Sequence, residues 1–182
     1  RWIKTRDKDK PFFLYMPFIA PHSPLEAPDD LVKKYEDLED TRELTRSAAI
    51  DRTRTLNGFS PSARPMYAAV VDGLDQAIGQ VLDTLAKEGI EEETIILFSS
   101  DNGGAAYAGG GADNFPLRGG KGDTYEGGIR VVAAMKWKGT LDAGKSFESI
   151  MTVMDVFPTL ASAAGVSMLN TKEIWGRDLW SA

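Results

Sequence analysis

The hydrophobic residues of this chain fall into short apolar runs of strand length and longer stretches with helical spacing. Residues 11–19 (PFFLYMPFI) and 94–99 (TIILFS) are too short and too apolar for amphipathic helices. We expect each to form a buried strand, the second in a parallel sheet. Residues 131–137 (VVAAMKW) predict a further strand.

Helical spacing is strongest over residues 63–87, where apolar side chains recur at steps of three and four. Residues 28–35 predict a short helix, and residues 150–164 a longer one that ends at Gly165 and holds Pro158 in its first turn. In that last helix we interpret Asp155 as a cap or first-turn acid rather than a metal ligand.

Two polar or irregular segments complete the pattern. Residues 36–62 are rich in charged residues and predict a surface excursion, and residues 173–180 predict a short docking segment. Helices alternating with strands predict an α/β fold, mostly a parallel sheet flanked by helices, in a single domain over residues 1–182.

Composition narrows the function classes. The net charge is -6, with 27 acidic and 21 basic residues, which argues against nucleic acid as a partner. No apolar run approaches the length of a membrane span, so we expect no membrane partner. Cysteine is absent, which excludes disulfides, thiolate metal sites and cysteine nucleophiles. With one histidine, a multi-histidine zinc site from this chain alone is also excluded.

Candidate chemistry begins where the second apolar run ends. Asp101 and Asn102 follow it directly, at the carboxyl end of the predicted strand, where α/β sheets place ligand sites. Their oxygens suit a hard cation such as Ca²⁺ or Mg²⁺. The same residues would equally suit an Asx turn.

A candidate proton donor lies after the first apolar run. His22 sits between Pro21 and Pro24, on a stiff loop at the exit of the predicted strand. A lone histidine is more often an ordinary surface residue, but its place at a strand exit makes it a candidate functional group.

Residues 114–130 form a glycine-rich segment that carries Arg118 and Lys121. Glycines allow close approach of the backbone to a ligand, and the two cations could contact an anion. The segment does not match the G-x-x-x-x-G-K-[ST] pattern of a Walker phosphate-binding loop. A glycine-rich loop with a purely structural role is the alternative interpretation. Together, a metal-binding pair, an anion-binding cation and a proton donor are what cleavage of a charged oxyanion ester requires.

These features resemble the sulfatases of the alkaline phosphatase superfamily, especially the arylsulfatase B-like type. The resemblance implies an alkaline-phosphatase-like fold and hydrolysis of sulfate esters. The matching runs, in the family's order, are PFFLYMPFIAPHSP (11–24), YAAVVDGLDQAIGQVL (67–82), SSDNGG (99–104), PLRGGKGDTYEGGIR (116–130) and DVFPTLASAAG (155–165).

By this resemblance, Asp101 and Asn102 are two of the four protein ligands of a divalent cation, usually calcium. Lys121 is similar to the lysine that contacts the substrate sulfate and the nucleophile. His22 is similar to the histidine that binds the sulfate and can assist departure of the alcohol oxygen. The family's nucleophile is a formylglycine.

Three other charged residues of the matching run, Arg118, Glu126 and Arg130, are expected to support the loop rather than take part in chemistry. The sequence also departs from the family, since it lacks the Asp pair that completes the metal site and the Cys- or Ser-x-Pro-x-Arg motif that yields formylglycine. The nearest string, residues 60–64 (SPSAR), has its proline one place early.

We therefore expect the chain to be the middle-to-C-terminal part of a sulfatase catalytic domain, inactive alone. Surfaces left open would favour self-association. The resemblance favours a periplasmic or secreted parent. The alternatives are a phosphonate or phosphodiester hydrolase of the same superfamily and a non-catalytic binding or assembly module.

Overall fold

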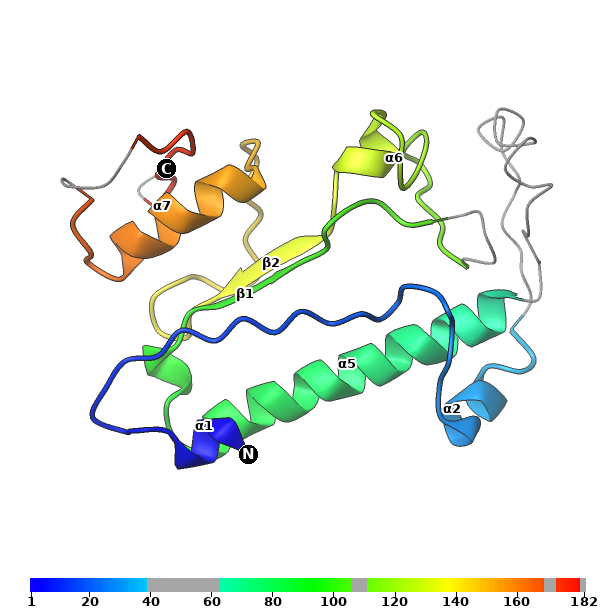
Figure 1. Ribbon diagram of the computed structural model, residues 1–182, viewed down its shortest axis with the longest axis horizontal. Helices are drawn as coiled ribbons and strands as arrows, with labels where there is room; N and C mark the ends of the chain where they lie inside the picture. The colour runs from blue at the N-terminus through cyan, green and yellow to red at the C-terminus, as the bar shows by residue number, and fades with distance from the viewer. Residues whose placement is uncertain (39–62, 106–110, 169–172, 181–182) are drawn as a thin grey trace. The chain divides into compact units, whose positions relative to one another are not determined.

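A computed structural model describes residues 1–38, 63–105, 111–168 and 173–180 (Figure 1). Their contacts divide the chain into two compact units, Arg1–Asp142 and Ala143–Ala182, and each is described by itself. The single domain expected from the sequence stays a prediction, and most of the predicted surface excursion, residues 39–62, lies outside the described residues.

Helix α5 (Ala63–Lys87) is the main element of the first unit, and it has the bounds that the apolar spacing predicts. Its end is a Schellman motif, in which Gly89 adopts a φ of +71°. The Ile90 amide donates to the Leu85 carbonyl oxygen at 3.1 Å, and the Gly89 amide donates to that of Ala86 at 3.0 Å. Local signals in the sequence therefore fix where this helix stops.

Two short helices, α1 (Trp2–Thr5) and α2 (Asp29–Lys34), pack against α5 (Figure 1). Each contributes one buried apolar side chain. The buried hydrophobic residues of the described chain are Ile3, Leu31, Ala69, Val70, Leu85 and Ala112, so the core lies mainly along α5.

A polar contact joins α2 to α5. Lys34 Nζ lies 2.6 Å from Asp72 Oδ2, and the Tyr35 hydroxyl donates to the same oxygen at 3.0 Å. The hydrogen bond from Lys34 lowers the pKa of Asp72, and the same bond raises the pKa of Lys34. The helix predicted over residues 28–35 is confirmed.

Strands β1 (Ile96–Ser99) and β2 (Ala133–Lys136) pair antiparallel, with Ile96 opposite Lys136 and Ser99 opposite Ala133. The expectation of a mostly parallel sheet is wrong for these two strands. The chain that follows β1 folds back onto the end of that strand, and β2 starts at this same end of the sheet. The two strands therefore run in opposite directions. Ile96 and Leu97 are half-buried and Phe98 is exposed, so β1 is not the fully buried strand expected.

The predicted buried strand over residues 11–19 is also wrong. This segment has no assigned secondary structure, and Phe13 and Ile19 are 82% and 81% exposed. Within the described ranges, residues 11–18 form no backbone hydrogen bond with another strand. An apolar, β-prone run becomes a buried strand only where a neighbouring strand and a covering face are present.

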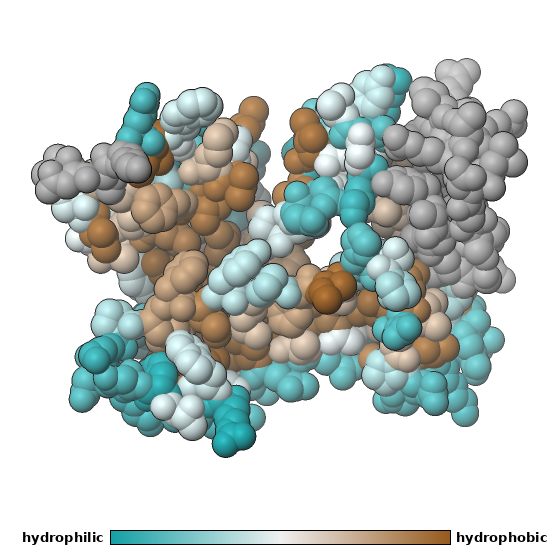
Figure 2. All heavy atoms as spheres, viewed as in Figure 1, coloured by the Kyte–Doolittle hydropathy of each residue, from teal (hydrophilic) through white to brown (hydrophobic). Residues whose placement is uncertain are grey.

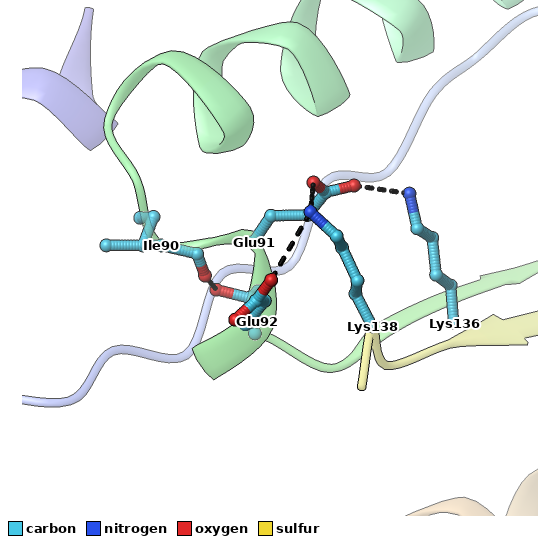
Figure 3. A network of polar contacts seen from close by, with 6 residues as sticks. Ile90, Glu91, Glu92, Lys136 and Lys138 are labelled. Carbon is cyan, nitrogen blue, oxygen red and sulfur yellow. Dashed lines mark hydrogen bonds and ion pairs between the residues drawn. The ribbon is translucent and has the colours of Figure 1, made fainter. Parts of the chain in front are cut away.

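The short helix η1 (Glu91–Glu93) is tied to the end of β2 by ion pairs (Figure 3). Glu91 lies 2.5 Å from Lys136 Nζ and 3.2 Å from Lys138 Nζ, and the Trp137 indole donates to the Glu92 carbonyl oxygen at 2.8 Å. Hydrogen bonds from the two lysines, that of Lys136 first, lower the pKa of Glu91.

The second unit is built on helix α7 (Val153–Ala163). A capping box starts it: Asp155 Oδ2 accepts hydrogen bonds from the Thr152 amide at 2.7 Å and hydroxyl at 2.9 Å. Asp155 is thus a helix cap, as predicted. Because this box starts the helix at Val153, Pro158 lies inside the helix and not in its first turn, which corrects the sequence prediction.

The predicted docking segment, residues 173–180, is held on α7 by further hydrogen bonds. The Arg177 amide donates to Asp155 Oδ1 at 2.7 Å, and the Leu179 amide donates to Thr159 Oγ1 at 3.1 Å. Gly176 packs so closely that a Cβ there would meet the Met154 carbonyl oxygen, which Pro158 cannot engage because it has no N–H. The docking segment therefore packs against α7 at the point where Pro158 cannot supply the usual helical hydrogen bond to the Met154 carbonyl oxygen.

Many large apolar side chains remain on the surface, and Figure 2 shows hydrophobic residues interspersed with polar ones on the face that it presents. The most exposed of them are Phe13, Ile19, Ile150, Val153 and Trp175. None of the helices in the described ranges has both the length and the apolar character needed to cross a membrane.

Candidate functional site

The predicted metal-binding pair lies on the turn that follows β1. The Ser100 amide donates to the Val132 carbonyl oxygen at 3.1 Å, extending the strand pairing by one step. The Ser100 hydroxyl then donates to the Asn102 carbonyl oxygen at 2.8 Å and closes the turn. Asp101 is exposed and Asn102 is half-buried.

The glycine-rich loop folds back onto this turn through its backbone. The Gly103 amide donates to the Gly128 carbonyl oxygen at 2.9 Å, and the Lys121 amide donates to the Gly104 carbonyl oxygen at 3.2 Å. Lys121 is therefore held next to the chain that follows Asp101 and Asn102. The structure thus brings the backbone of Lys121 close to the turn that carries Asp101 and Asn102.

Glycine is required in this loop mainly because backbone packs on backbone. A Cβ on Gly103 would meet the Gly127 carbonyl oxygen, and one on Gly127 would lie 2.6 Å from the carbonyl oxygen of Arg118. Gly119 and Gly122, on either side of Lys121, have φ of +82° and +91°. These glycines shape the turn that presents Lys121, whereas the sequence suggested that they make room for a ligand.

Three other charged residues of the loop make contacts within this part of the chain. The Arg118 guanidinium stacks 3.7 Å from the centroid of the Tyr125 ring, and Arg130 lies 3.1 Å from Glu126 one turn away on α6 (Glu126–Ile129). These contacts fit the expectation that Arg118, Glu126 and Arg130 support the loop.

His22 lies on a turn in which its amide donates to the Ile19 carbonyl oxygen at 2.9 Å. Its Nδ1 lies 2.6 Å from the Ser23 carbonyl oxygen, which can only accept, so Nδ1 carries the hydrogen. Nε2 is then the ring atom left for a ligand. Within the described ranges, no hydrogen bond or ion pair joins His22 to Asp101, Asn102 or Lys121.

The site has unused capacity for ligands. In the part of the chain that the structure describes, no hydrogen bond or ion pair engages the carboxylate of Asp101 or the ammonium of Lys121. The same ranges contain no group of three His, Cys, Asp or Glu side chains that could hold a metal ion. Asp101 and Asn102 offer the hard oxygens that a divalent cation prefers, but they would supply only part of its ligand set.

Sequence reasoning missed one residue of this site, Asn114, whose side chain hydrogen-bonds to the backbone of Gly104 and Gly119. The only sequence signal was its position two residues before the PLRGGK run.

The sulfatase family model matches residues 1–166 of the chain. Arylsulfatase J of Mus musculus is 35% identical over 178 residues, covering 98% of this chain and 26% of the mouse protein. A sulfatase of Formosa agariphila is 35% identical over 182 residues, covering 94% of this chain and 29% of that protein.

Solved structures agree with the family model. The chain matches the crystal structure of Ps i-CgsB in complex with k-i-k-neocarrahexaose with a TM-score of 0.71 and 32% identity, over 88% of this chain and 31% of that one. A glycosaminoglycan-metabolism protein of Bacteroides thetaiotaomicron, at 24% identity and a TM-score of 0.72, supports the fold alone.

The chain spans less than a third of the length of the curated relatives named above. These neighbours assign it an alkaline-phosphatase-like α/β fold, and the family model covers most of its length. The chain belongs to the sulfatase family.

Proposed function

We propose that this chain carries part of the active site of a sulfuric ester hydrolase, in which His22 and Lys121 bind the sulfate ester and Asp101 and Asn102 bind a divalent cation. The observation that carries the proposal is the pair of backbone hydrogen bonds that hold the loop of Lys121 against the chain that follows the Asp101–Asn102 turn. Membership of the sulfatase family supports the choice of sulfate over other oxyanion esters.

Lys121 is suited to bind the sulfate because its ammonium offers three N–H donors and a full positive charge. A sulfate monoester carries its negative charge on oxygens that such a group can contact. The two glycines with positive φ on either side of Lys121 turn the backbone sharply, so the side chain leaves a short, well-supported loop.

Asp101 and Asn102 would provide oxygen ligands to the cation, Ca²⁺ being the expected ion. Ca²⁺ takes about 6–8 oxygens, so the remaining ligands would come from water or from other parts of the whole protein. When bound, the cation would offset the negative charge of the sulfate ester.

His22 is suited to act on the leaving group. Because Nδ1–H is engaged by the Ser23 carbonyl oxygen, Nε2 is the atom that would face the ester oxygen. In its protonated form Nε2 would donate a proton to the departing alcohol oxygen as the S–O bond breaks.

The nucleophile would be a formylglycine from a Cys- or Ser-x-Pro-x-Arg motif, which the 182 residues lack. We therefore infer that the chain by itself has no turnover, because binding groups do not replace a nucleophile. The whole protein would then be a sulfatase more than twice as long. A periplasmic or secreted location rests on the family resemblance and stays a prediction.

The test compares variants of the full-length gene product that contains this chain, with 4-nitrophenyl sulfate as the substrate. We expect Lys121→Ala to lower kcat/KM by about 100-fold or more, because a charge contact to the reacting group is lost. Lys145→Ala, at an exposed position of the second unit, is the matched control and should leave kcat/KM unchanged.

Two results would contradict the proposal. One is full activity of Lys121→Ala in the full-length protein. The other is faster turnover of bis(4-nitrophenyl) phosphate than of 4-nitrophenyl sulfate, which would favour the phosphodiester alternative. Turnover of the sulfate by the isolated 182 residues, lost on Lys121→Ala, would contradict only the claim that the chain alone is inactive.

A further inference from the structure

The carboxamide of Asn114 uses both its acceptor and its donors within the glycine-rich loop. Oδ1 accepts a hydrogen bond from the Gly104 amide at 2.9 Å. Nδ2 donates to the Gly104 carbonyl oxygen at 2.9 Å and to the Gly119 carbonyl oxygen at 3.2 Å. The side chain thus pairs with both polar groups of Gly104, much as a neighbouring strand would.

Gly104 links this side chain to the candidate site. It lies two residues after Asn102, and its carbonyl oxygen also accepts the hydrogen bond from the Lys121 amide at 3.2 Å. Gly119, the other partner of Asn114, lies two residues before Lys121. Asn114 therefore hydrogen-bonds both to the backbone that follows the Asp101–Asn102 turn, at Gly104, and to the backbone that precedes Lys121, at Gly119.

The carboxamide of Asn114 lies close to the backbone of two glycines, Gly104 and Gly120. A Cβ on Gly104 would lie 3.0 Å from Asn114 Oδ1 and 2.5 Å from the Cβ of Ala112. A Cβ on Gly120 would lie 2.9 Å from Asn114 Nδ2. Real Cβ atoms essentially never come as close to a neighbour as the one at Gly120 would, and the approach at Gly104 would be unusually tight, so glycine at both positions gives the carboxamide its room.

The chemistry of the three bonds requires an asparagine. Aspartate has the same shape, but it would replace the Nδ2 donors with an oxygen that faces the carbonyl oxygens of Gly104 and Gly119. Alanine would leave those backbone groups without the partner they have now.

We propose that Asn114 is a positioning residue that fixes the place of Lys121 relative to the Asp101–Asn102 turn. This inference rests on the function proposed above. Its effect on the reaction would pass through Lys121, because a misplacement of about 1 Å in a binding group can cost about 100-fold in rate.

The kinetic test is a double-mutant cycle in the full-length gene product, with 4-nitrophenyl sulfate as substrate. We expect Asn114→Asp and Asn114→Ala each to lower kcat/KM by about 10- to 100-fold. In the Lys121→Ala background, the same substitutions should lower it by less than about 3-fold, because the group that Asn114 positions is already gone.

A second readout does not depend on activity. We expect Asn114→Asp to speed hydrogen exchange of the Gly104 and Lys121 amides, the first bonded to Asn114 and the second to the carbonyl oxygen that Asn114 also contacts. The matched control is Gly89→Ala at the end of α5, which should lower stability without a selective change in these amides or in kcat/KM.

The outcomes separate this inference from the function on which it rests. If Lys121→Ala leaves kcat/KM unchanged, the proposed function fails, and the inference fails with it. A second outcome is that Lys121→Ala strongly lowers kcat/KM, and the Asn114 substitutions lower kcat/KM by the same factor with or without Lys121. The proposed function then stands, but positioning through Lys121 is overturned. If neither Asn114 variant folds, Asn114 is a folding residue, and the inference is likewise overturned.

Discussion

At the scale of single residues, Asp155 illustrates how one carboxylate holds a unit together. It caps α7 through Thr152 and also accepts a hydrogen bond from the Arg177 amide, so it joins the helix to the docking segment. The side chain is only 3% exposed, although it carries a charge. Hydrogen bonds from backbone amides compensate for the loss of water.

These bonds make the stability of the second unit depend on pH. The amide of Arg177 first, and that of Thr152 next, hold the pKa of Asp155 below its usual range. Because the folded-state pKa is the lower one, the stabilisation is complete above the pKa of an unfolded aspartate, about 4, and is lost as pH falls further. We expect Asp155→Asn to lower the unfolding temperature at pH 6 and to differ less from wild type at pH 3.

Thermal unfolding followed by circular dichroism at both pH values measures this. Asp75→Asn is the matched control, since Asp75 is exposed on α5 and the same charge is removed there. The difference in unfolding temperature between wild type and Asp155→Asn should be smaller at pH 3 than at pH 6. An equal difference at both pH values would contradict the stabilising role of the charged Asp155 carboxylate.

The sequence predicted the role of Asp155 but not that of Asn114, and the reason is physical. A cap is a local feature, because Asp155 and the Thr152 groups from which it accepts lie within one helical turn. The partners of Asn114, Gly104 and Gly119, lie ten and five residues away and become neighbours only when the loop has folded. The spacing of residues along the chain does not predict such contacts.

At the scale of elements, one glycine inside α5 and one just after its end allow a matched comparison. Gly79 lies inside the helix, and a Cβ there would meet nothing within 4 Å. Gly89 follows the helix with a φ of +71°, a conformation that side chains with a Cβ disfavour.

We expect the same substitution to have opposite effects at these two positions. Gly79→Ala should raise the free energy of unfolding by about 0.5–1 kcal/mol, because alanine loses less backbone entropy in a helix. Gly89→Ala should lower it by about 1 kcal/mol, because the left-handed conformation is strained for alanine. Urea denaturation of the two variants measures both, and effects of the same sign would contradict the placement of the helix end.

The contact between η1 and β2 offers a second prediction at this scale. Glu91 accepts from both Lys136 and Lys138 (Figure 3). Glu93, in the same short helix, is exposed. We expect Glu91→Gln to lower the unfolding temperature more than Glu93→Gln, and the difference to shrink in high salt, because ion pairs at the surface are screened. Equal effects of the two variants at low salt would show that the ion pairs add nothing.

Helices were easier to predict from this sequence than strands. The bounds of α5 follow from its apolar spacing and its terminal glycine, which are local signals. Residues 11–19 have an equally clear strand composition, yet they form no strand, because a strand needs a partner outside its own sequence. The direction of β1 relative to β2 was missed for the same reason, since it depends on how the glycine-rich loop folds back.

At the scale of the whole molecule, the described chain combines a small hydrophobic core with a large exposed apolar surface. The buried hydrophobic residues are few and lie mostly along α5, while Phe13 and Ile19 are among many large side chains in contact with solvent. Monomeric proteins rarely expose large contiguous apolar surfaces, which favour association with other surfaces. Among the described residues, the run over residues 11–19 has no strand that pairs with its backbone, so it resembles an exposed sheet edge.

We therefore predict that the isolated 182-residue chain self-associates through this run. Sedimentation velocity over a range of protein concentrations should show an average mass that rises with concentration, because apolar side chains leave water on association. The double variant Phe13→Ser, Ile19→Ser should shift this rise to higher concentration, since it removes two of the most exposed apolar side chains. Lys10→Ser, an exposed position just before the run, is the control and should behave as wild type. A wild-type chain that stays monomeric at every concentration would contradict the prediction of self-association. A double variant that associates as strongly as the wild type would show that the association does not depend on these two side chains.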